Sequence, residues 1–265
     1  MPEKTIIITI GQRKGGVAKS TSTLNLAYAL AEQGHRVLIV DLDDQQNATN
    51  SITSHLAGDL TVADLLLQDD IDITAVMQAT SWPNVWMLPA SGNLSGVAKH
   101  LDSEVGGHLV LAEKLQAARD LDFVLIDTSP SLNILVINAL CASNHLFIPL
   151  SSKYFSLQGL SKTLGAYGKV KQRLNPDLSL LGMAFVIHDK RNTLACEIVA
   201  KVRSQYPSLL FESIIGVNIK IEEAQVNKQS VLTYAPMDRG AQQYRALAGE
   251  ILTRTGSLKP EAAHV

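Results

Sequence analysis

The residues best suited to chemistry lie between positions 10 and 21, in the segment IGQRKGGVAKST. Lys14 and Lys19 flank two consecutive glycines, and two hydroxyl side chains follow Lys19. Backbone N–H groups of a glycine-bearing loop and of a helix N-terminus bind phosphate oxygens, and a lysine adds positive charge. The segment therefore predicts a phosphate-binding loop made of Gly15, Gly16, Val17, Ala18, Lys19, Ser20 and Thr21.

The polar residues of this loop have distinct expected roles. We expect Lys19 to reach the β- and γ-phosphates, Ser20 to offer its hydroxyl directly to Mg²⁺, and Thr21 to cap the helix near the α-phosphate. The usual pattern G-x-x-x-x-G-K-[ST] is not met, because Arg13 and Ala18 stand where its two glycines belong. A Cβ at residue 18 crowds the phosphates or restricts the backbone. We therefore expect nucleotide affinity or turnover to be lowered rather than lost.

Carboxylates follow two of the apolar runs. The segment VDLDDQQN carries Asp41 and Asp43, and DFVLIDTSPS carries Asp127 after four apolar residues. A carboxylate at a strand end beside a phosphate loop can hold a metal-bound water or orient the attacking water. We expect Asp43 to position the attacking water, Asp41 to support the loop, and Asp43 and Asp127 to hold Mg²⁺ through water. The alternatives are a solvated acidic turn at Asp43 and a helix cap at Asp127.

The elements that must position these residues are short apolar runs that alternate with helical patterns. Such alternation indicates a parallel sheet covered by helices on both faces, which binds ligands beyond the carboxyl ends of its strands. We therefore predict an α/β fold with a doubly wound, mostly parallel sheet. It forms a single domain over 1–255 with a flexible tail over 256–265, and the weakly patterned stretch 58–107 is expected to be a variable surface region. The expected strands cover residues 5–10, 36–42, 85–90, 122–128, 144–150 and 178–187.

Composition excludes several classes of protein. The 265 residues are 46% hydrophobic and 18% charged, which is typical of a soluble globular chain. No apolar run approaches the ~20 residues that span a bilayer, and the N-terminus does not have the pattern of a signal peptide. The net charge of −2 gives no global attraction to nucleic acid, so DNA binding would require a local basic patch. We expect Cys141 and Cys196 to be buried or inert thiols in a reducing cytoplasm.

Several segments resemble the ParA/MinD-type ATPases, which are P-loop proteins with a deviant loop of the form K-G-G-x-G-K-[ST]-T. KGGVAKST matches this loop, VDLDDQQNAT resembles the D-x-D-P-Q-x-N switch segment, and DFVLIDTSPSL matches the second acidic strand. PLSSKYFSLQGL and YAPMDRGAQQYRALAGEI resemble two later family segments. The resemblance covers nearly the whole chain and is specific to the ParA (Soj-like) branch. It implies a P-loop NTPase fold, ATP and Mg²⁺ as cofactors, and hydrolysis of ATP to ADP and phosphate.

The resemblance also implies roles for individual residues. Lys14 corresponds to the signature lysine, which crosses the interface of an ATP-bound sandwich homodimer to the nucleotide of the other subunit. Asp43 corresponds to the hydrolytic aspartate, and Pro236 and Met237 fall where the family packs the adenine ring. Asp44 replaces the family proline and adds negative charge near the γ-phosphate, so we expect slow hydrolysis that a partner stimulates. The expected catalytic residues are Lys14, Lys19 and Asp43.

DNA binding is a further implication of the resemblance. Family members bind double-stranded DNA without sequence preference, through basic residues that neutralise phosphates and release counterions. Arg191 matches one such arginine, and Lys220 matches a second position where the family has arginine. Lys190, Lys201 and Arg203 are additional candidates for the same patch. The alternative is a solvated basic helix face.

The function implied is segregation of plasmid or chromosomal DNA by a cytoplasmic, nucleoid-associated ATPase, with a ParB-like partner that stimulates hydrolysis. An alternative is the same cycle positioning a protein cargo, such as a carboxysome or chemoreceptor cluster, through a cargo-adaptor protein. The chain starts at its first strand, so no N-terminal DNA-binding extension is expected.

Two other functions are less well supported. A MinD-like membrane regulator needs a C-terminal amphipathic helix, but the apolar residues near 239–254 are expected to pack on the core. An iron–sulfur reductase would need a cysteine shortly after Asp127, and residues 128–140 contain none. We therefore expect no membrane partner.

Overall fold

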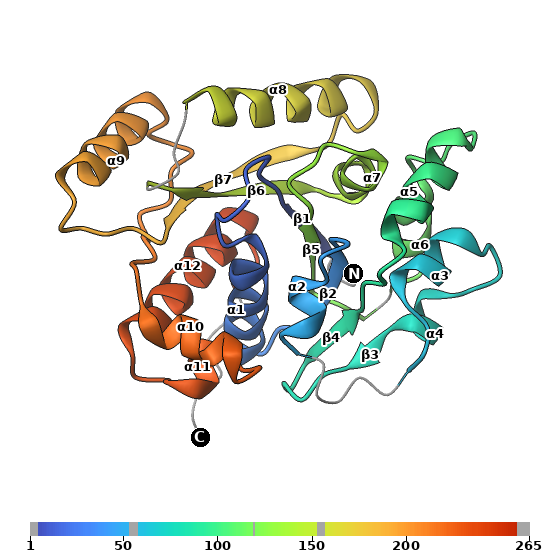
Figure 1. The fold of residues 1–265 in the computed structure, drawn as a ribbon, viewed down its shortest axis with the longest axis horizontal. Helices are drawn as coiled ribbons and strands as arrows, with labels where there is room; N and C mark the ends of the chain where they lie inside the picture. The colour runs from blue at the N-terminus through green and yellow to red at the C-terminus, as the bar shows by residue number, and fades with distance from the viewer. Residues whose placement is uncertain (1–4, 53–57, 119, 153–156, 259–265) are drawn as a thin grey trace.

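The computed structural model describes residues 5–52, 58–118, 120–152 and 157–258, and its centre is a seven-stranded sheet (Figure 1). The strands are β1 (Ile6–Ile10), β2 (Val37–Leu42), β3 (Gln78–Ala79), β4 (Val85–Leu88), β5 (Phe123–Thr128), β6 (His145–Ser151) and β7 (Ser179–Val186). Their order in the sheet is β3-β4-β2-β5-β1-β6-β7, and all neighbours are parallel except β3 and β4. The predicted doubly wound, mostly parallel sheet is confirmed.

All the predicted strands are present, because each is an apolar run that packs on both of its faces. Every residue of β2 and of β5 is buried, which is the pattern of parallel strands covered on both sides. The sequence does not predict β3, since its two residues are too few to show an alternating pattern.

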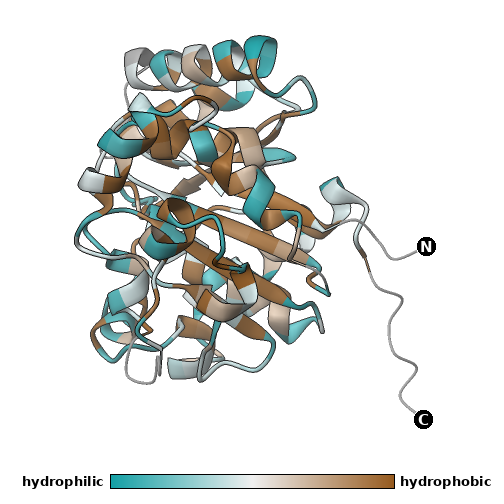
Figure 2. Ribbon diagram, turned by 90° about the vertical axis from the view of Figure 1, so that its right-hand side faces the viewer, coloured by the Kyte–Doolittle hydropathy of each residue, from teal (hydrophilic) through white to brown (hydrophobic). Residues whose placement is uncertain are grey.

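Helices cover both faces of the sheet. They are α1 (Lys19–Glu32), α2 (Asn47–Asn50), α3 (Val62–Leu67), α4 (Ile73–Val76), α5 (Leu94–Ser103), α6 (Val110–Leu115), α7 (Ile134–Ala142), α8 (Leu157–Arg173), α9 (Thr193–Gln205), α10 (Ile219–Val226), α11 (Val231–Tyr234) and α12 (Arg239–Thr255). On one face α1 and α12 pack against strand residues such as Ile39 and Leu125. On the other, α3, α5, α6 and α7 pack against Leu38 and Val124, and α8 and α9 cover β6 and β7. Figure 2 shows the apolar strands lying between these layers.

The stretch 58–107 is a packed part of the domain, and the expectation of a surface region is wrong. Leu65, Leu94 and Val97 are fully buried in the cluster that covers β2 and β5. The helices of this stretch are short, between four and ten residues, so none repeats its apolar spacing long enough to be recognised.

The C-terminal helix packs on the core as expected. Helix α12 buries Tyr244, Leu247 and Ile251 against α1 and the sheet. Among the described residues, no helix is long and apolar enough to cross a membrane. Of the tail expected over 256–265, Gly256 is the left-handed C-cap of α12, and 259–265 lie outside the described residues.

The two cysteines differ in exposure. Cys141 is half-buried on α7, whereas Cys196 is exposed on α9. Of the two alternatives expected, burial or inertness, the inertness of Cys196 stays a prediction, and burial does not hold for this residue. The reason is that Ala195 and Val202 are the buried residues of α9, which leaves the neighbouring position outside the core.

Candidate nucleotide and magnesium site

The candidate site lies at the carboxyl ends of three adjacent strands. In the sheet β5 lies between β1 and β2, and Asp127 is in register with both Ile10 and Asp41. Residues 11–18 lead from the end of β1 to the first turn of α1. Because these strands are parallel, the predicted loop and the predicted carboxylates meet at one edge of the sheet.

The loop has the backbone shape of an anion cradle. Gly16 has φ 72°, and Ala18 is left-handed at φ 50° and ψ 41°, directly before the first residue of α1. A left-handed conformation raises the free energy of a non-glycine residue by about 1–2 kcal/mol. The backbone restriction expected at Ala18 is therefore present as strain. A Cβ at Gly15 would meet no atom of the described residues within 4 Å, so the described part of the chain leaves space beside the loop.

The loop and the switch segment enclose a hollow of about 360 Å³. The structure brings the predicted Lys19, Ser20 and Asp43 to this hollow, whereas Lys14 is half-buried and is not among its lining residues. The full lining is Gly15, Gly16, Val17, Ala18, Lys19, Ser20, Thr21, Asp43, Gln45, Asn47, Pro130 and Gln225.

Sequence reasoning missed some of these lining residues. Three of them, Gln45, Asn47 and Pro130, lie in the two segments that contain the predicted aspartates. Their closeness in sequence to those aspartates could have indicated them. Gln225 comes from α10, and no local pattern indicates that it lies at the loop. Its side-chain oxygen is 3.5 Å from Oγ1 of Thr21.

The buried aspartates have different partners. Oδ2 of Asp41 accepts hydrogen bonds from N and Oγ1 of Thr49 at 2.8 and 2.7 Å, and its Oδ1 accepts from N of Asp43 at 3.0 Å. Thr49 Oγ1 in turn accepts from N of Ala90 at 2.9 Å, which ties the switch loop to the end of β4. Asp41 therefore supports the loop, as expected.

Asp127 is fully buried, and neither of its carboxylate oxygens has a hydrogen-bond partner among the described residues. Burial and the charge of Asp41 raise the pKa of Asp127 to about 8. Burial likewise raises the pKa of Asp43, and burial lowers the pKa of Lys19 despite the nearby Asp127 and Asp43. The chain alone thus leaves the negative charge of this site uncompensated, and a divalent cation would compensate it.

The residues present fit Mg²⁺. The Ser20 hydroxyl is close enough to lower the pKa of Asp127 and is the kind of oxygen ligand that Mg²⁺ prefers. The two Asp127 oxygens, which have no hydrogen-bond partner among the described residues, could accept from waters bound to the ion. Ser20 would hold the ion directly, and Asp43 and Asp127 would hold it through water. Bound Mg²⁺ supplies positive charge to phosphate oxygens in the transition state.

A neighbouring hollow of about 240 Å³ shares Gly16, Ala18 and Thr21 with the loop. Its other walls come from the end of β7, segment 215–218, α10 and Tyr244 of α12, and they include Ile187, Asn218 and Ile221. The predicted Pro236 and Met237 are exposed and are not among its lining residues. Their carbonyl oxygens accept from Arg245 Nη1 at 2.6 Å and Gln242 Nε2 at 3.1 Å.

The candidate DNA-binding residues are not among the residues that line the nucleotide hollow, and several are ion-paired. Arg191 Nε is 2.9 Å from Asp189 Oδ1, and Lys220 Nζ is 2.7 Å from Glu223 Oε2. Arg203 pairs with Glu212, whereas no described carboxylate forms an ion pair with Lys190 or Lys201. The structure brings Lys190 and Arg191 to one hollow, and places Lys201 and Arg203 further along α9 and Lys220 on α10.

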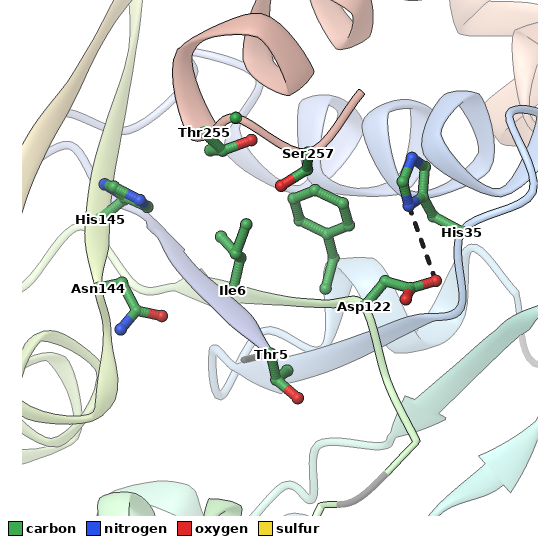
Figure 3. A pocket seen from close by; sticks show the side chains of 10 residues that line it. Thr5, Ile6, His35, Asp122, Asn144, His145, Thr255 and Ser257 are labelled. Carbon is green, nitrogen blue, oxygen red and sulfur yellow. Dashed lines mark ion pairs between the residues drawn. The ribbon is translucent and has the colours of Figure 1, made fainter. Parts of the chain in front are cut away.

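A polar hollow of about 360 Å³ also opens at the opposite end of the sheet (Figure 3). His35, Asp122 and His145 line it, and His35 Nδ1 is 3.7 Å from Asp122 Oδ2. It lies where β1, β5 and β6 begin, whereas ligands of parallel sheets bind where the strands end. Although this hollow is as large as the one at the phosphate loop, its position excludes it as the nucleotide site.

Comparison with known proteins agrees with this geometry. A family described as an AAA domain matches residues 5–180. The chain is 39% identical over 254 residues to the chromosome-partitioning ATPase Soj of Treponema pallidum, covering 96% of this chain and 98% of that protein. It is 32% identical over 261 residues to the chromosome partitioning protein ParA of Caulobacter vibrioides, covering 97% of each.

Solved structures share the fold and bind nucleotide. Cobyrinic acid a,c-diamide synthase from Mycobacterium smegmatis, with bound ADP and magnesium, has a TM-score of 0.83 at 30% identity over 97% of each chain. The septum site-determining protein MinD of Pyrococcus horikoshii, complexed with Mg-ADP, has a TM-score of 0.79 at 24% identity, covering 97% of this chain and 99% of that one. With a glycine-bearing loop before α1, buried aspartates at the neighbouring strand ends and these relatives, the chain belongs to the ParA/MinD-type P-loop ATPases and uses ATP and Mg²⁺.

Proposed function

We propose that this protein segregates plasmid or chromosomal DNA. ATP closes two copies into a sandwich homodimer that binds nucleoid DNA without sequence preference, and a ParB-like partner bound to cargo DNA stimulates hydrolysis and release. The partitioning names of the relatives from T. pallidum and C. vibrioides support this function. The protein would then be cytoplasmic and nucleoid-associated.

The observation that carries the proposal is the separation of the two loop lysines. Lys19 is buried and lines the nucleotide hollow, whereas Lys14 is half-buried and lies outside its lining. Gly15 and Gly16, which follow Lys14, are exposed, so no described residue covers this part of the loop against a second molecule. We assign Lys14 to the nucleotide of the second copy, where its charge offsets repulsion between two triphosphates.

Hydrolysis is assigned to Asp43. Its side chain is at the hollow and only 5% exposed, and Oδ1 accepts from N of Gln45 at 3.1 Å, which fixes the carboxylate beside Lys19. In this proposal Asp43 orients the attacking water, and the strained Ala18 and the extra charge of Asp44 keep turnover slow until the partner binds.

The adenine base is assigned to the hollow beside the loop. Ile187 and Ile221 supply apolar surface, as is typical of small-molecule sites. The Asn218 amide caps α10 by accepting from N of Lys220 at 2.7 Å and donates to Asp238 Oδ1 at 2.6 Å, which leaves one N–H and one lone pair for the base. The role of Pro236 and Met237 in holding the base stays a prediction, because they lie outside this lining.

A matched pair of lysine variants tests the dimer. Lys14→Gln should abolish ATP-dependent dimerisation, measured by analytical ultracentrifugation, and should leave ATP affinity of the monomer nearly unchanged. Lys19→Gln should lose ATP binding itself. ATP-dependent dimers of the Lys14 variant would refute the assignment.

Asp43→Ala tests hydrolysis. This variant should bind ATP, remain dimeric and stay on DNA, while phosphate release falls to background. Phosphate release at the wild-type rate would remove Asp43 from its role.

The double variant Arg191→Glu, Lys220→Glu tests the DNA patch, which also includes Lys190, Lys201 and Arg203 in this proposal. It should lose DNA binding at moderate salt but keep ATP-dependent dimerisation. A pull-down with the ATP-loaded dimer then identifies the partner, because a ParB-like clamp implies DNA cargo and a small adaptor implies protein cargo.

A further inference from the structure

A basic hollow lies beyond the carboxyl end of β7, near the start of α9. Figure 1 shows where these two elements lie. The hollow has a volume of about 290 Å³, and its walls come from the chain after β7, from segment 214–217 and from the start of α12. The polar residues that line it are His188, Asp189, Lys190, Arg191, Arg239 and Gln243.

Positive charge dominates this hollow. It contains the cations Lys190, Arg191 and Arg239, against the single carboxylate of Asp189. Lys190 and Arg239 are exposed, and no described carboxylate forms an ion pair with either. In a chain of net charge −2, this local excess can attract a phosphate group that the whole surface would not.

Asp189 holds Arg191 in the way that a phosphate would. Arg191 donates from Nε to Oδ1 at 2.9 Å and from Nη2 to Oδ2 at 3.0 Å, and its backbone N donates to the same Oδ1 at 3.0 Å. Two parallel bonds from a guanidinium are also how arginine binds phosphate oxygens. The Arg191 side chain is 83% exposed, so an incoming phosphate can reach it.

We propose that this hollow receives a backbone phosphate of double-stranded DNA, with Arg239 and Lys190 as ligands beside Arg191. Asp189 is an internal competitor, which occupies the Arg191 guanidinium until the phosphate replaces it. This inference rests on the DNA binding proposed above, and it adds Arg239 as a contact and Asp189 as a negative determinant of affinity.

The first test removes the charge of Arg239. DNA affinity of the ATP-bound protein is measured by fluorescence anisotropy over a range of salt concentrations. Arg239→Gln should lower the affinity and reduce the slope of log K against log salt by about one, as expected for one lost phosphate contact. Lys99→Gln removes the same charge from α5, where Lys99 is exposed, and should leave the slope unchanged.

The second test releases Arg191. Asp189→Asn keeps an oxygen that can accept from the Arg191 backbone N, but it removes the competing charge, so DNA affinity should rise about two- to fivefold. Asp102→Asn, at an exposed position of α5, controls for the loss of one negative charge. In an Arg191→Gln background the gain from Asp189→Asn should shrink to that of Asp102→Asn.

Two results would overturn the inference: Arg239→Gln behaving like Lys99→Gln, or Asp189→Asn behaving like Asp102→Asn.

Inorganic phosphate at constant ionic strength should not displace DNA when its concentration only equals that of the DNA phosphates. Displacement would assign the hollow to free phosphate instead. Sedimentation with ATP confirms that each variant folds and dimerises. Absence of DNA binding by the wild-type protein would refute the proposed function. If the wild type binds DNA and the Arg239 and Asp189 variants bind it as their controls do, only this inference is refuted.

Discussion

Asp41 and Asp127 lie opposite each other in the register of β2 and β5, but among the described residues Asp41 has hydrogen-bond partners and Asp127 has none. The oxygens of Asp41 hold Thr49 and the backbone of Asp43, so this aspartate builds the switch loop. The oxygens of Asp127 have no partner among the described residues, although the side chain is fully buried. One carboxylate is therefore structural, and the other is available to a magnesium-bound water.

Exchanging each of these aspartates for asparagine should separate the two roles. Asp41→Asn should lower the free energy of unfolding of the nucleotide-free protein by about 1–3 kcal/mol, because bonds to a buried charged group are lost. Asp127→Asn should change that stability little but lose the stabilisation by Mg-ATP, which is about 2.7 kcal/mol at a hundredfold excess over Kd. Thermal unfolding with and without Mg-ATP measures both. A full Mg-ATP shift in the Asp127 variant would contradict this division.

A glycine at position 18 should remove the backbone strain of the phosphate loop. Ala18 has φ 50°, where a glycine is unstrained, so Ala18→Gly should raise the free energy of unfolding by up to about 1 kcal/mol after its larger unfolded-state entropy is counted. Urea unfolding without nucleotide checks this. Ala200→Gly, at an exposed helical position of α9, is the control and should lower stability by about 1 kcal/mol. A loss of similar size at residue 18 would show that the loop is not strained there.

The pKa of Asp189 should report on Arg191. Hydrogen bonds from the Arg191 side chain and backbone lower this pKa to about 2. A depressed pKa means that the ion pair is intact above the ordinary value near pH 3.8 and is lost as pH falls through about 2. NMR titration of the Asp189 carboxyl should give the low value in the wild type and a higher one in Arg191→Gln. Equal values would mean that the pair does not form in solution.

The cysteines should differ in reactivity. Burial raises the pKa of Cys141 to about 11, so its thiolate is scarce at pH 8, whereas Cys196 is exposed. A maleimide at pH 8 should label Cys196 quickly and Cys141 slowly, as resolved by mass spectrometry of the digested protein. Cys196→Ser should remove the fast phase. A fast phase that persists in this variant would place Cys141 at the surface.

The sequence by itself determined the parts of this protein that are local. The loop over 10–21, the apolar runs and the carboxylates at their ends are contiguous patterns, and the parallel arrangement of strands brings their ends to one edge. The fold class, the six longer strands and the place of Lys19, Ser20 and Asp43 at one hollow therefore followed from the chain alone.

The tertiary structure decided which distant segments complete the site. Asn25 Oδ1 accepts from N of Val231 at 2.9 Å, which anchors α11 to α1 and, with α12, helps to bring Gln225 of α10 to the phosphate loop. It also placed Pro236 outside the adjacent hollow. Such contacts join residues whose neighbours in sequence carry no common pattern, because they depend on how helices pack across the sheet. No reading of local periodicity contains that information.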